Sequence, residues 1–364
     1  MGDSETAPWG FRTDQDWRSL SRDAGPTATP HWARAWVDAY GARYDLDSSL
    51  LEHKPGEAIL PLVRPRRRPW RLELLSAREL AEPVDVVASD TTSVDSLASA
   101  LAARGENVFL RRVPAGSALV PSLEHAYRRR GTVIVGATSP SPVLPIDETW
   151  AEPERHMGKR RRSDLRRARR RAEELGKVEY DLVAPTEAEL DGYLDELVAV
   201  ESHGWKGRAS TALAHQAAQQ QFFRSYARAA AREGELRLSF LRIDDQVAAA
   251  QLAVHRAAAL WLLKIGYDEQ FARCSPGTLL LLEAVATAAL QGARNVEFLG
   301  MAKPWTARWT TSERSYVRVL AYARTPSAMP CLVEDTYRFV RHTVLERREA
   351  AKTAQYAGTA GEGE

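Results

Sequence analysis

The sequence contains only two cysteines among its 364 residues, Cys274 and Cys331, so it cannot carry a framework of disulfides, and we expect a reducing compartment. It has no apolar run of the ~18 residues that a membrane-spanning helix needs. The N-terminal residues include acids and no apolar segment, so we expect no secretory signal and a cytoplasmic location. The spacings typical of zinc sites, P-loops and dinucleotide-binding glycine motifs are absent, so we expect neither a metal nor those nucleotide sites.

Lysine is also scarce, since seven lysines stand beside 43 arginines, and a lysine at an unusual position is therefore of interest. The 50 basic and 48 acidic residues nearly balance, so the chain as a whole is not strongly attracted to nucleic acid or to a membrane surface. A hydrophobic content of 44% and a charged content of 27% are typical of a soluble globular protein. The length corresponds to about two domains.

The clearest secondary-structure pattern lies in the last third of the chain. It predicts three strands between residues 236 and 267, a helix over 276–291 and a strand over 295–299. Residues 49–112 repeat this order of strands, helix and strand, although no repeat is visible at the level of residues. We therefore predict an α+β protein of two tandem domains with mainly antiparallel sheets flanked by helices.

A long helix is predicted between the two halves, with Thr149 and Glu152 as a capping box and Gly176 as its end. The predicted organisation is an N-terminal domain at 1–148, a basic linking helix at 149–177, a C-terminal domain with the candidate site at 178–330, and a C-terminal helix with a disordered tail at 331–364.

The linking helix carries the strongest charge signal, because nine of the thirteen residues from Lys159 to Arg171 are basic. Such a run is usually a solvated helix face. It also suits an RNA backbone or an anionic lipid surface, although no aromatic RNA-recognition motif accompanies it. The candidate RNA or anion contacts are Arg162, Arg166, Arg169 and Arg170.

The start of the helix predicted at 276–291 is a candidate phosphate site. Ser275 can cap the helix, and Pro276 suits its first position. Gly277 permits the close approach of a ligand to free backbone N–H groups, so Ser275, Gly277 and Thr278 are the candidate phosphate contacts. The first turn holds no acid, and Arg273 just upstream can pair with a second phosphate. The alternative is a plain connection between a strand and a helix. The corresponding turn in the first half of the chain carries acids, which favours a site in the C-terminal half.

This order of three strands, a phosphate-facing loop, a helix and a strand resembles the GNAT acyltransferase fold, and residues 273–278 resemble a degraded form of its pyrophosphate loop. Three strings, at 201–207, at 264–268 with 275–277, and at 297–300 with the tryptophans that follow, resemble the cellulose-biosynthesis-type (CelD/BcsL) acetyltransferases. That family is related in fold to the Fem-type aminoacyl transferases, which carry two tandem GNAT-like domains.

The resemblance implies that an amine attacks a thioester held between two central strands, at 260–267 and 295–299. On this basis Asp268, Glu297 and His255 are candidate bases and Tyr267 is a candidate acid. His255 is more typical of a surface histidine at the end of a strand. Asp268 can equally serve only to cap the loop. Glu297 lies in an apolar strand, so it must face a cleft or a cation.

The same resemblance suggests residues for the acceptor. Lys264 lies inside an apolar strand and needs a partner, for which Glu297 is a candidate. The other candidate contacts form a lip after one helix and a loop after the last central strand, and they are Glu201, Trp205, Lys206, Lys303, Trp305 and Trp309. Ordinary packing is the alternative for each tryptophan.

Three functions stay open at this stage. The first is an N-acyltransferase that uses acetyl-CoA or another acyl-CoA and an amine acceptor on a small molecule, a sugar or a peptide. The second is an amide-forming transferase of the Fem type, with aminoacyl-tRNA as donor and tRNA on the basic helix. The third is a non-catalytic GNAT-like scaffold. The oligomeric state and the pathway are not determined by the sequence.

Overall fold

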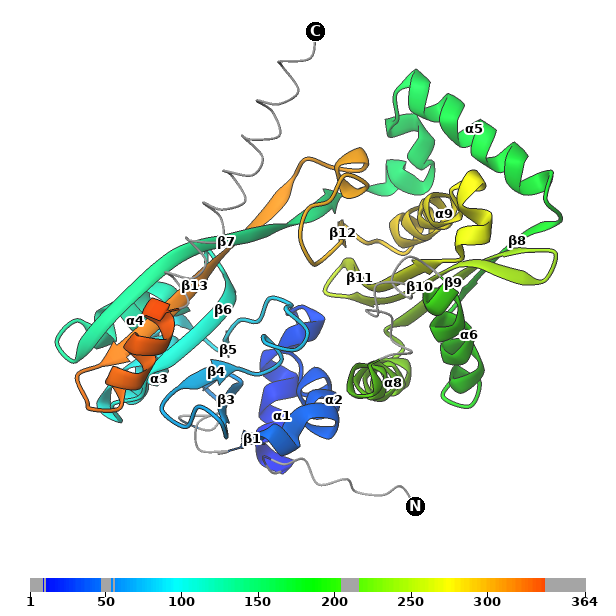
Figure 1. Ribbon diagram of the computed structural model, residues 1–364. Helices are drawn as coiled ribbons and strands as arrows, with labels where there is room; N and C mark the ends of the chain where they lie inside the picture. The colour runs from blue at the N-terminus through cyan, green and yellow to red at the C-terminus, as the bar shows by residue number, and fades with distance from the viewer. Residues whose placement is uncertain (1–8, 10, 47–53, 55, 204–215, 338–364) are drawn as a thin grey trace, which may run out of the picture.

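The computed structural model of the chain describes residues 9, 11–46, 54, 56–203 and 216–337. Among these residues, eleven strands form one long mixed sheet with helices on both of its faces (Figure 1). The predicted α+β class is therefore confirmed. No helix of the described part is long and apolar enough to cross a membrane.

The C-terminal part of the sheet follows the predicted order closely. Helices cover one face at α5 (Lys159–Glu173) and α9 (Pro276–Leu290), and the other at α6 (Leu190–His203) and α8 (Ala217–Arg232), as Figure 1 shows. Two separate cores result, one on each face. The strands are β8 (Val178–Val183), β9 (Leu236–Ile243), β10 (Gln246–Arg256), β11 (Ala259–Tyr267) and β12 (Asn295–Glu297).

The N-terminal part of the sheet is covered on one face by α3 (Thr91–Ala103) and α4 (Leu119–Tyr127), which enclose a third core. The pattern of residues 93–104 predicts a helix, which corresponds to α3, whereas the sequence does not predict α4. The strands of the sheet here are β1 (Tyr44–Asp45), β3 (Leu62–Pro65), β4 (Leu72–Leu74) and β6 (Val108–Pro114), and a separate pair is formed by β2 (Ala58–Ile59) and β5 (Val87–Ala88).

Two long strands, β7 (Gly131–Pro145) and β13 (Glu313–Ala323), connect the two parts (Figure 1). β7 pairs with β12 at its end and with β13 along the rest of its length, and β13 pairs with β6 on its other side. The order of the sheet is therefore β1-β3-β4-β6-β13-β7-β12-β11-β10-β9-β8. The last strand of the chain is thus inserted among strands of the first half.

The sequence predicts two strands, at 132–135 and 143–146, where the structure has the single strand β7. The stretch between them contains Pro140, which cannot donate to a ladder. It stays in the strand because the ladder is irregular between Arg314 and Tyr316, so that β7 carries the extra residues at this point.

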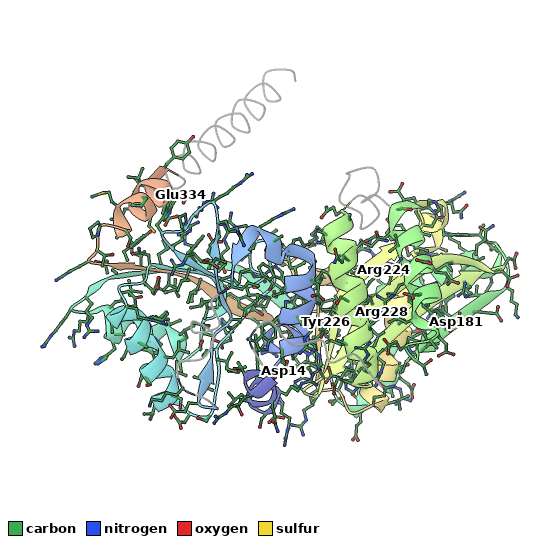
Figure 2. The ribbon with its side chains drawn as sticks, turned by 90° about the horizontal axis from the view of Figure 1, so that it is seen from below. Asp14, Asp181, Arg224, Tyr226, Arg228 and Glu334 are labelled. Carbon is green, nitrogen blue, oxygen red and sulfur yellow. The ribbon has the colours of Figure 1, made fainter. Side chains whose placement is uncertain are left out.

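The N-terminal helices α1 (Phe11–Leu20) and α2 (Pro30–Tyr40) reach across to the C-terminal part. The ring of Trp32 lies 4.8 Å from Phe222 and 5.0 Å from Tyr226 of α8, both edge-on. Figure 2 shows Tyr226 where α8 meets the N-terminal helices. The aromatic residues of 31–40 recur at every fourth position, which predicts a packed helix face, and α2 confirms it. The sequence does not predict α1.

The prediction of one long helix from Thr149 to Gly176 is wrong. Residues 148–151 and 153–156 form two 3₁₀ turns, η4 and η5, and α5 begins only at Lys159. Pro153 lacks the N–H that a continuing helix needs, and Gly158 is extended immediately before α5. The capping-box pattern was therefore misleading.

α5 does not stand free between the two halves. Its buried stripe of Leu165, Ala168 and Ala172 belongs to the core that α9 also lines, and the helix contacts α9 and the 3₁₀ turn η7 (Glu269–Cys274). At the other end of the chain, residues 328–337 are helical after β13. The rest of the predicted C-terminal helix and the predicted disordered tail lie outside the described residues.

Candidate functional site

The candidate site is a cavity where two neighbouring strands diverge. β11 pairs with β12 in parallel only from Ala259 to Trp261, and β12 ends at Glu297 while β11 continues to Tyr267. Opposite β10, β11 carries a bulge with Leu263 as its extra residue. The diverging ends leave a cavity of about 550 Å³ next to the start of α9.

The cavity gathers residues that lie far apart in the sequence. It is lined by the second half of β11, the start of α9, the segment after β12, and one residue each from α6, β10, η7 and the loop that precedes β5. The predicted site residues that line it are Glu201, Lys264, Tyr267, Ser275, Gly277, Thr278, Lys303, Trp305 and Trp309. Trp205 and Lys206, also predicted, lie outside the described residues.

The walls of the cavity belong to both faces of the sheet. Tyr267 belongs to the core under α9. Lys264 points to the opposite face, where its ammonium group lies 4.7 Å from the ring centre of Phe223 on α8 and 3.4 Å from Gln219 Oε1. α6 packs closely on this face, because a Cβ on Gly266 would lie 3.2 Å from the Cα of Glu201. The cavity therefore connects a side at α9 with a side at α6 and α8.

The start of α9 presents an open helix N-terminus to the first of these sides. Ser275 adopts the left-handed conformation (φ 51°) and makes no side-chain cap, while its carbonyl accepts the N–H groups of Thr278 and Leu279. A Cβ on Gly277 would meet only Tyr267, at 3.8 Å. The first turn contains no acid. The N–H of Gly277 takes no part in these bonds, and together with the helix dipole it attracts an anion.

A rim of arginines lies beside this helix start. Arg273 is exposed and is not part of the cavity wall, and its carbonyl accepts a hydrogen bond from Arg171 of α5 at 3.1 Å. At the other end of α5, the guanidinium of Arg161 stacks 4.8 Å from the ring centre of Trp309, which lines the cavity. Burial and the charge of Arg308 lower the pKa of Arg161. α5 thus contacts the segment before the α9 start at one end and the cavity wall at the other.

The four arginines predicted as RNA or anion contacts differ in their surroundings. Arg169 pairs with Glu154, and Arg170 lies 3.4 Å from Glu174. Arg162 is half-buried and Arg166 is exposed. Only part of the basic run is therefore a bare solvated face.

The two carboxylates predicted as bases lie outside the cavity wall. Asp268 accepts the backbone N–H of Gln270 at 2.9 Å and caps η7, and it lies 3.5 Å from His203 Nδ1. Glu297 is buried and accepts the Nε–H of Arg314 at 2.7 Å. Arg314, and not Lys264, supplies the cation that its apolar strand requires.

A carboxylate that the sequence does not indicate, Glu82, enters the cavity from the N-terminal half. It is half-buried, and its Oε2 lies 3.5 Å from the backbone N of Gly300, which follows β12. Desolvation raises the pKa of Glu82 above its usual value, against the opposing charges of Arg112 and Lys264. It stands in an irregular loop before Pro83, so no periodicity or motif marks it.

Arg112 of β6 holds the segments around Glu82 together. Its guanidinium donates to the carbonyl of Ala81 at 2.8 Å, to the carbonyl of Gly300 at 2.9 Å and to the hydroxyl of Ser141 on β7. Arg112 lies in a bulge of β6 with a positive φ of 52°. Bulges turn side chains out of the regular alternation of a strand. This conformation is not visible in the sequence.

Gln251 of β10 is a second residue that the sequence does not indicate. It is buried, it lines the cavity, and its Oε1 accepts no hydrogen bond from any described residue. A buried acceptor without a donor costs free energy. The cavity therefore offers a place for an N–H or O–H group of a ligand. No group of three or more potential metal ligands occurs in the described part of the chain.

Comparison with known proteins gives the class of this fold. Residues 159–306 match the model of the acetyltransferase (GNAT) domain family. No curated protein matches the sequence. The match spans the strands, the loop and the helix that build the cavity, so the predicted GNAT-like fold is confirmed.

Solved structures resemble the chain over most of its length. FemX is 10% identical and covers 88% of this chain and 98% of its own, with a TM-score of 0.57. The C-terminal domain of a protein provisionally named lysylphosphatidylglycerol synthetase, from Agrobacterium fabrum, is 12% identical and covers 88% and 94%, with a TM-score of 0.57. A conserved protein from Bacteroides thetaiotaomicron is 10% identical and covers 85% and 97%, with a TM-score of 0.55. At identities this low the likeness shows the fold alone, and FemX shares that fold, as the sequence predicted for the Fem-type transferases.

Proposed function

We propose that this protein is an N-acyltransferase that moves an acyl group from acyl-CoA to an amine of a small molecule, a sugar or a peptide. The observation that carries the proposal is the cavity between the diverging ends of β11 and β12, which opens on the start of α9. A thioester lying along it presents its carbonyl carbon to an amine arriving from the other face. The match of residues 159–306 to a GNAT acetyltransferase domain supports this class of reaction, as does the resemblance to the CelD/BcsL-type enzymes.

The α9 side of the cavity suits the donor. We infer that Ser275, Gly277 and Thr278 receive the pyrophosphate at the helix N-terminus, with Arg273 at the exposed rim. The unpaired Oε1 of Gln251 is an acceptor for an amide N–H of the pantetheine arm. The residues of this side therefore fit an elongated donor with an anionic end.

The α6 and α8 side suits the acceptor. We infer that Glu201, Lys264 and Lys303 contact the acceptor there, while Trp305 and Trp309 form the wall toward the donor. Tyr267 lies on the donor side, where its hydroxyl can give a proton to the departing thiolate. The contacts of Asp268 and Glu297 favour structural roles for both.

Binding of acetyl-CoA tests the donor. Calorimetry of the wild type should give saturable binding, and Gly277→Asp should weaken it by about tenfold or more, because a carboxylate then faces the phosphates. An acid in the first turn favours the helix, so this variant should remain folded. Gly277→Asn adds nearly the same volume without charge and should bind much better than the Asp variant. Arg273→Glu should weaken binding less, since its side chain stands at the rim.

Equal binding by the Asp and Asn variants would place the donor away from the α9 start. Flat heats for the wild type would rule out acetyl-CoA and leave a longer acyl-CoA or aminoacyl-tRNA as donor. Binding of acetyl-CoA without thiol release in the presence of any amine would favour the GNAT-like scaffold.

A second candidate, amide formation from aminoacyl-tRNA, is favoured by the position of α5. This basic helix lies against η7 and α9, and it touches the donor side through Arg171 and Arg161. The shared fold with FemX and the resemblance to Fem-type aminoacyl transferases favour the same donor. A polyanionic donor larger than CoA would use this surface.

Salt-dependent retention of tRNA on the immobilised protein tests this candidate. If tRNA lies along α5, the double variant Arg162→Glu with Arg166→Glu should lower the slope of log affinity against log salt by about 1 to 2. The control, Arg128→Glu with Arg129→Glu, makes the same charge change at an exposed site after α4. Equal losses in both variants would show attraction to net charge alone.

A further inference from the structure

We propose that Glu82, supplied by the N-terminal half, is the group that takes the proton from the attacking amine. This inference rests on the proposed function and adds to it that the C-terminal half does not complete the site alone. Among the described residues that line the cavity, the carboxylates are Glu82 and Glu201.

The position of Glu82 fits a proton acceptor. It reaches the cavity beside Gly300, at the point where the chain leaves β12 and the two central strands have separated. Leu80 of the same loop packs against the core on the α8 side, and the charge of Lys264 acts on Glu82 from that side. Glu82 thus lies on the acceptor side, opposite the start of α9 where the donor's anionic end is placed.

Glu201 is a less suitable base. It is 2% exposed, and α6 packs it directly against Gly266 of β11, so it has little freedom to meet an incoming amine. It already takes part in an interaction. Glu82 is half-buried and meets the cavity from a loop, so an amine can reach its carboxylate.

The charges around Glu82 tune it for this task. Desolvation raises its pKa, which makes the carboxylate a stronger base than an exposed glutamate. Arg112 from β6, Lys264 from β11 and the N–H of Gly300 favour the charged form and so keep it available. The other charged residues of the cavity wall are Glu201 from α6 and Lys303 from the segment after β12.

Arg112 is the positioning residue for this carboxylate. It binds the carbonyl of Ala81, the residue before Glu82, and the carbonyl of Gly300, whose N–H faces the carboxylate. A third bond to Ser141 on β7 fixes the guanidinium between the two halves. The catalytic geometry therefore depends on three segments that only the tertiary structure brings together.

The proton balance of the step is simple. The carboxylate of Glu82 takes one proton from the alkylammonium group, and the freed lone pair forms the C–N bond at the carbonyl carbon. The C–S bond breaks with its electron pair on sulfur, and the second proton passes from nitrogen to that sulfur, for which Tyr267 is the proposed donor and relay. Glu82 then returns its proton to solvent, so the products are the amide, the thiol and one proton.

The test is thiol release from acetyl-CoA with two kinds of amine probe. Ethanolamine, glucosamine and lysine are alkylamines that arrive protonated, whereas aniline is unprotonated at neutral pH. Glu82→Gln should lower kcat for a reacting alkylamine by about 10² to 10⁴-fold and affect aniline much less. The rise of rate with pH should move up from the pKa of Glu82 to the pKa of the alkylamine itself, because solvent must then remove the proton. Acetyl-CoA binding should stay unchanged, because Glu82 is on the acceptor side.

Asp85→Asn is the matched control. Asp85 lies in the same loop, and burial raises its pKa too, but its carboxylate binds Ser117 and does not line the cavity. This variant should keep wild-type rates and pH dependence. Equal rates for Glu82→Gln and wild type on an alkylamine, or equal losses on alkylamine and aniline, would overturn the proposal.

A second measurement does not need turnover. The infrared difference between wild type and Glu82→Gln across pH should show a carboxyl whose pKa exceeds the ordinary value of about 4.3 and which is ionised at pH 8. An ordinary pKa, or a carboxyl still protonated at pH 8, would overturn the role of Glu82. If wild type neither binds acetyl-CoA nor releases thiol, the proposed donor fails, and this titration alone decides on Glu82.

Discussion

Buried carboxylates have different roles here according to their partners. Glu297 is buried in an apolar strand, and Arg314 neutralises it through two nitrogen donors on one oxygen. Glu82 is desolvated but has no such bidentate partner, and a cavity lies in front of it. A buried charge with a full partner stabilises the fold, whereas a desolvated charge beside a cavity is available for chemistry.

The pair of Glu297 and Arg314 gives a prediction at this scale. Arg314→Met should lower the free energy of unfolding by about 2 to 3 kcal/mol, because it leaves a buried carboxylate without its donors. Arg318→Met changes an exposed arginine of the same strand and should have little effect.

Urea denaturation measures both variants. The double variant Glu297→Met with Arg314→Met should be more stable than Arg314→Met alone, because the unpaired charge is then removed. A single variant as stable as wild type would show that water reaches Glu297 and would reopen its candidacy as a base.

At the scale of elements, ion pairs fasten the end of the chain to the N-terminal sheet. Arg71, before β4, is buried and binds Glu73 at 2.9 Å and Asp335 at 3.0 Å, and Arg78 also binds Glu73. Figure 2 shows the helix that carries Glu334, which pairs with Arg68. The helical residues 328–337 therefore complete the N-terminal part of the molecule, although they come last in the described chain.

This network gives a prediction with a defined pH dependence. Burial by itself raises the pKa of Glu73, but the bonds and charges of Arg78 and Arg71 outweigh it, and the pKa lies below its ordinary value. The native state therefore holds the charged form more strongly than the unfolded state does. The stabilisation that the charged Glu73 gives is complete at pH values above about 4.3, its pKa in the unfolded state. This stabilisation is lost as the pH falls through the pKa of Glu73 in the folded state.

Glu73→Gln should consequently lower the free energy of unfolding by about 3 kcal/mol at pH 7. The difference from wild type should shrink in acid. Urea midpoints at pH 7 and at pH 3 measure this change. Glu187→Gln, which removes an exposed pair with Arg232, should leave the midpoint nearly unchanged at both values. A difference from wild type that grows in acid would contradict the assignment.

At the scale of the whole molecule, the two halves share both a sheet and a core. β7 pairs with β12 on one side and with β13 on the other, so the ladder runs through the junction without a gap. On the α8 face, Trp32 and Trp36 of α2 belong to the same buried cluster as Phe222 and Leu238. The GNAT match at 159–306 includes neither α2 nor β7. That segment therefore lacks part of its own core.

The shared core predicts that the chain unfolds as one unit. Near-ultraviolet and far-ultraviolet circular dichroism should give coincident urea transitions for the full chain. Trp32→Ala should lower the free energy of unfolding by about 3 to 5 kcal/mol, because it leaves a large cavity between α2 and α8.

Residues 159–306 expressed alone should not give a cooperative transition, because both the aromatic face of α8 and the edge of β12 are then uncovered. Two separate transitions in the full chain, or a cooperative isolated segment, would show that the halves are independent domains.

Neighbouring residues encode the local features of this protein. Periodicity and turn residues predicted β9, the start of α9 and the strands around it, because alternation and helix-start chemistry are properties of neighbouring residues. The motifs on these elements also led to the GNAT-like fold, and nine of the predicted site residues line the cavity. The same local patterns failed where Pro153 and Gly158 interrupted the predicted linking helix.

Long-range packing sets which charged groups are paired and which residues of the N-terminal half enter the site. Arg314 pairs with Glu297, and Arg112 lies in a strand bulge that redirects its side chain. Glu82 reaches the cavity from a loop that no sequence pattern marks. These contacts join residues that lie tens to hundreds of positions apart. Their formation depends on packing, desolvation and strand register across the whole sheet, and no pattern among sequence neighbours encodes it.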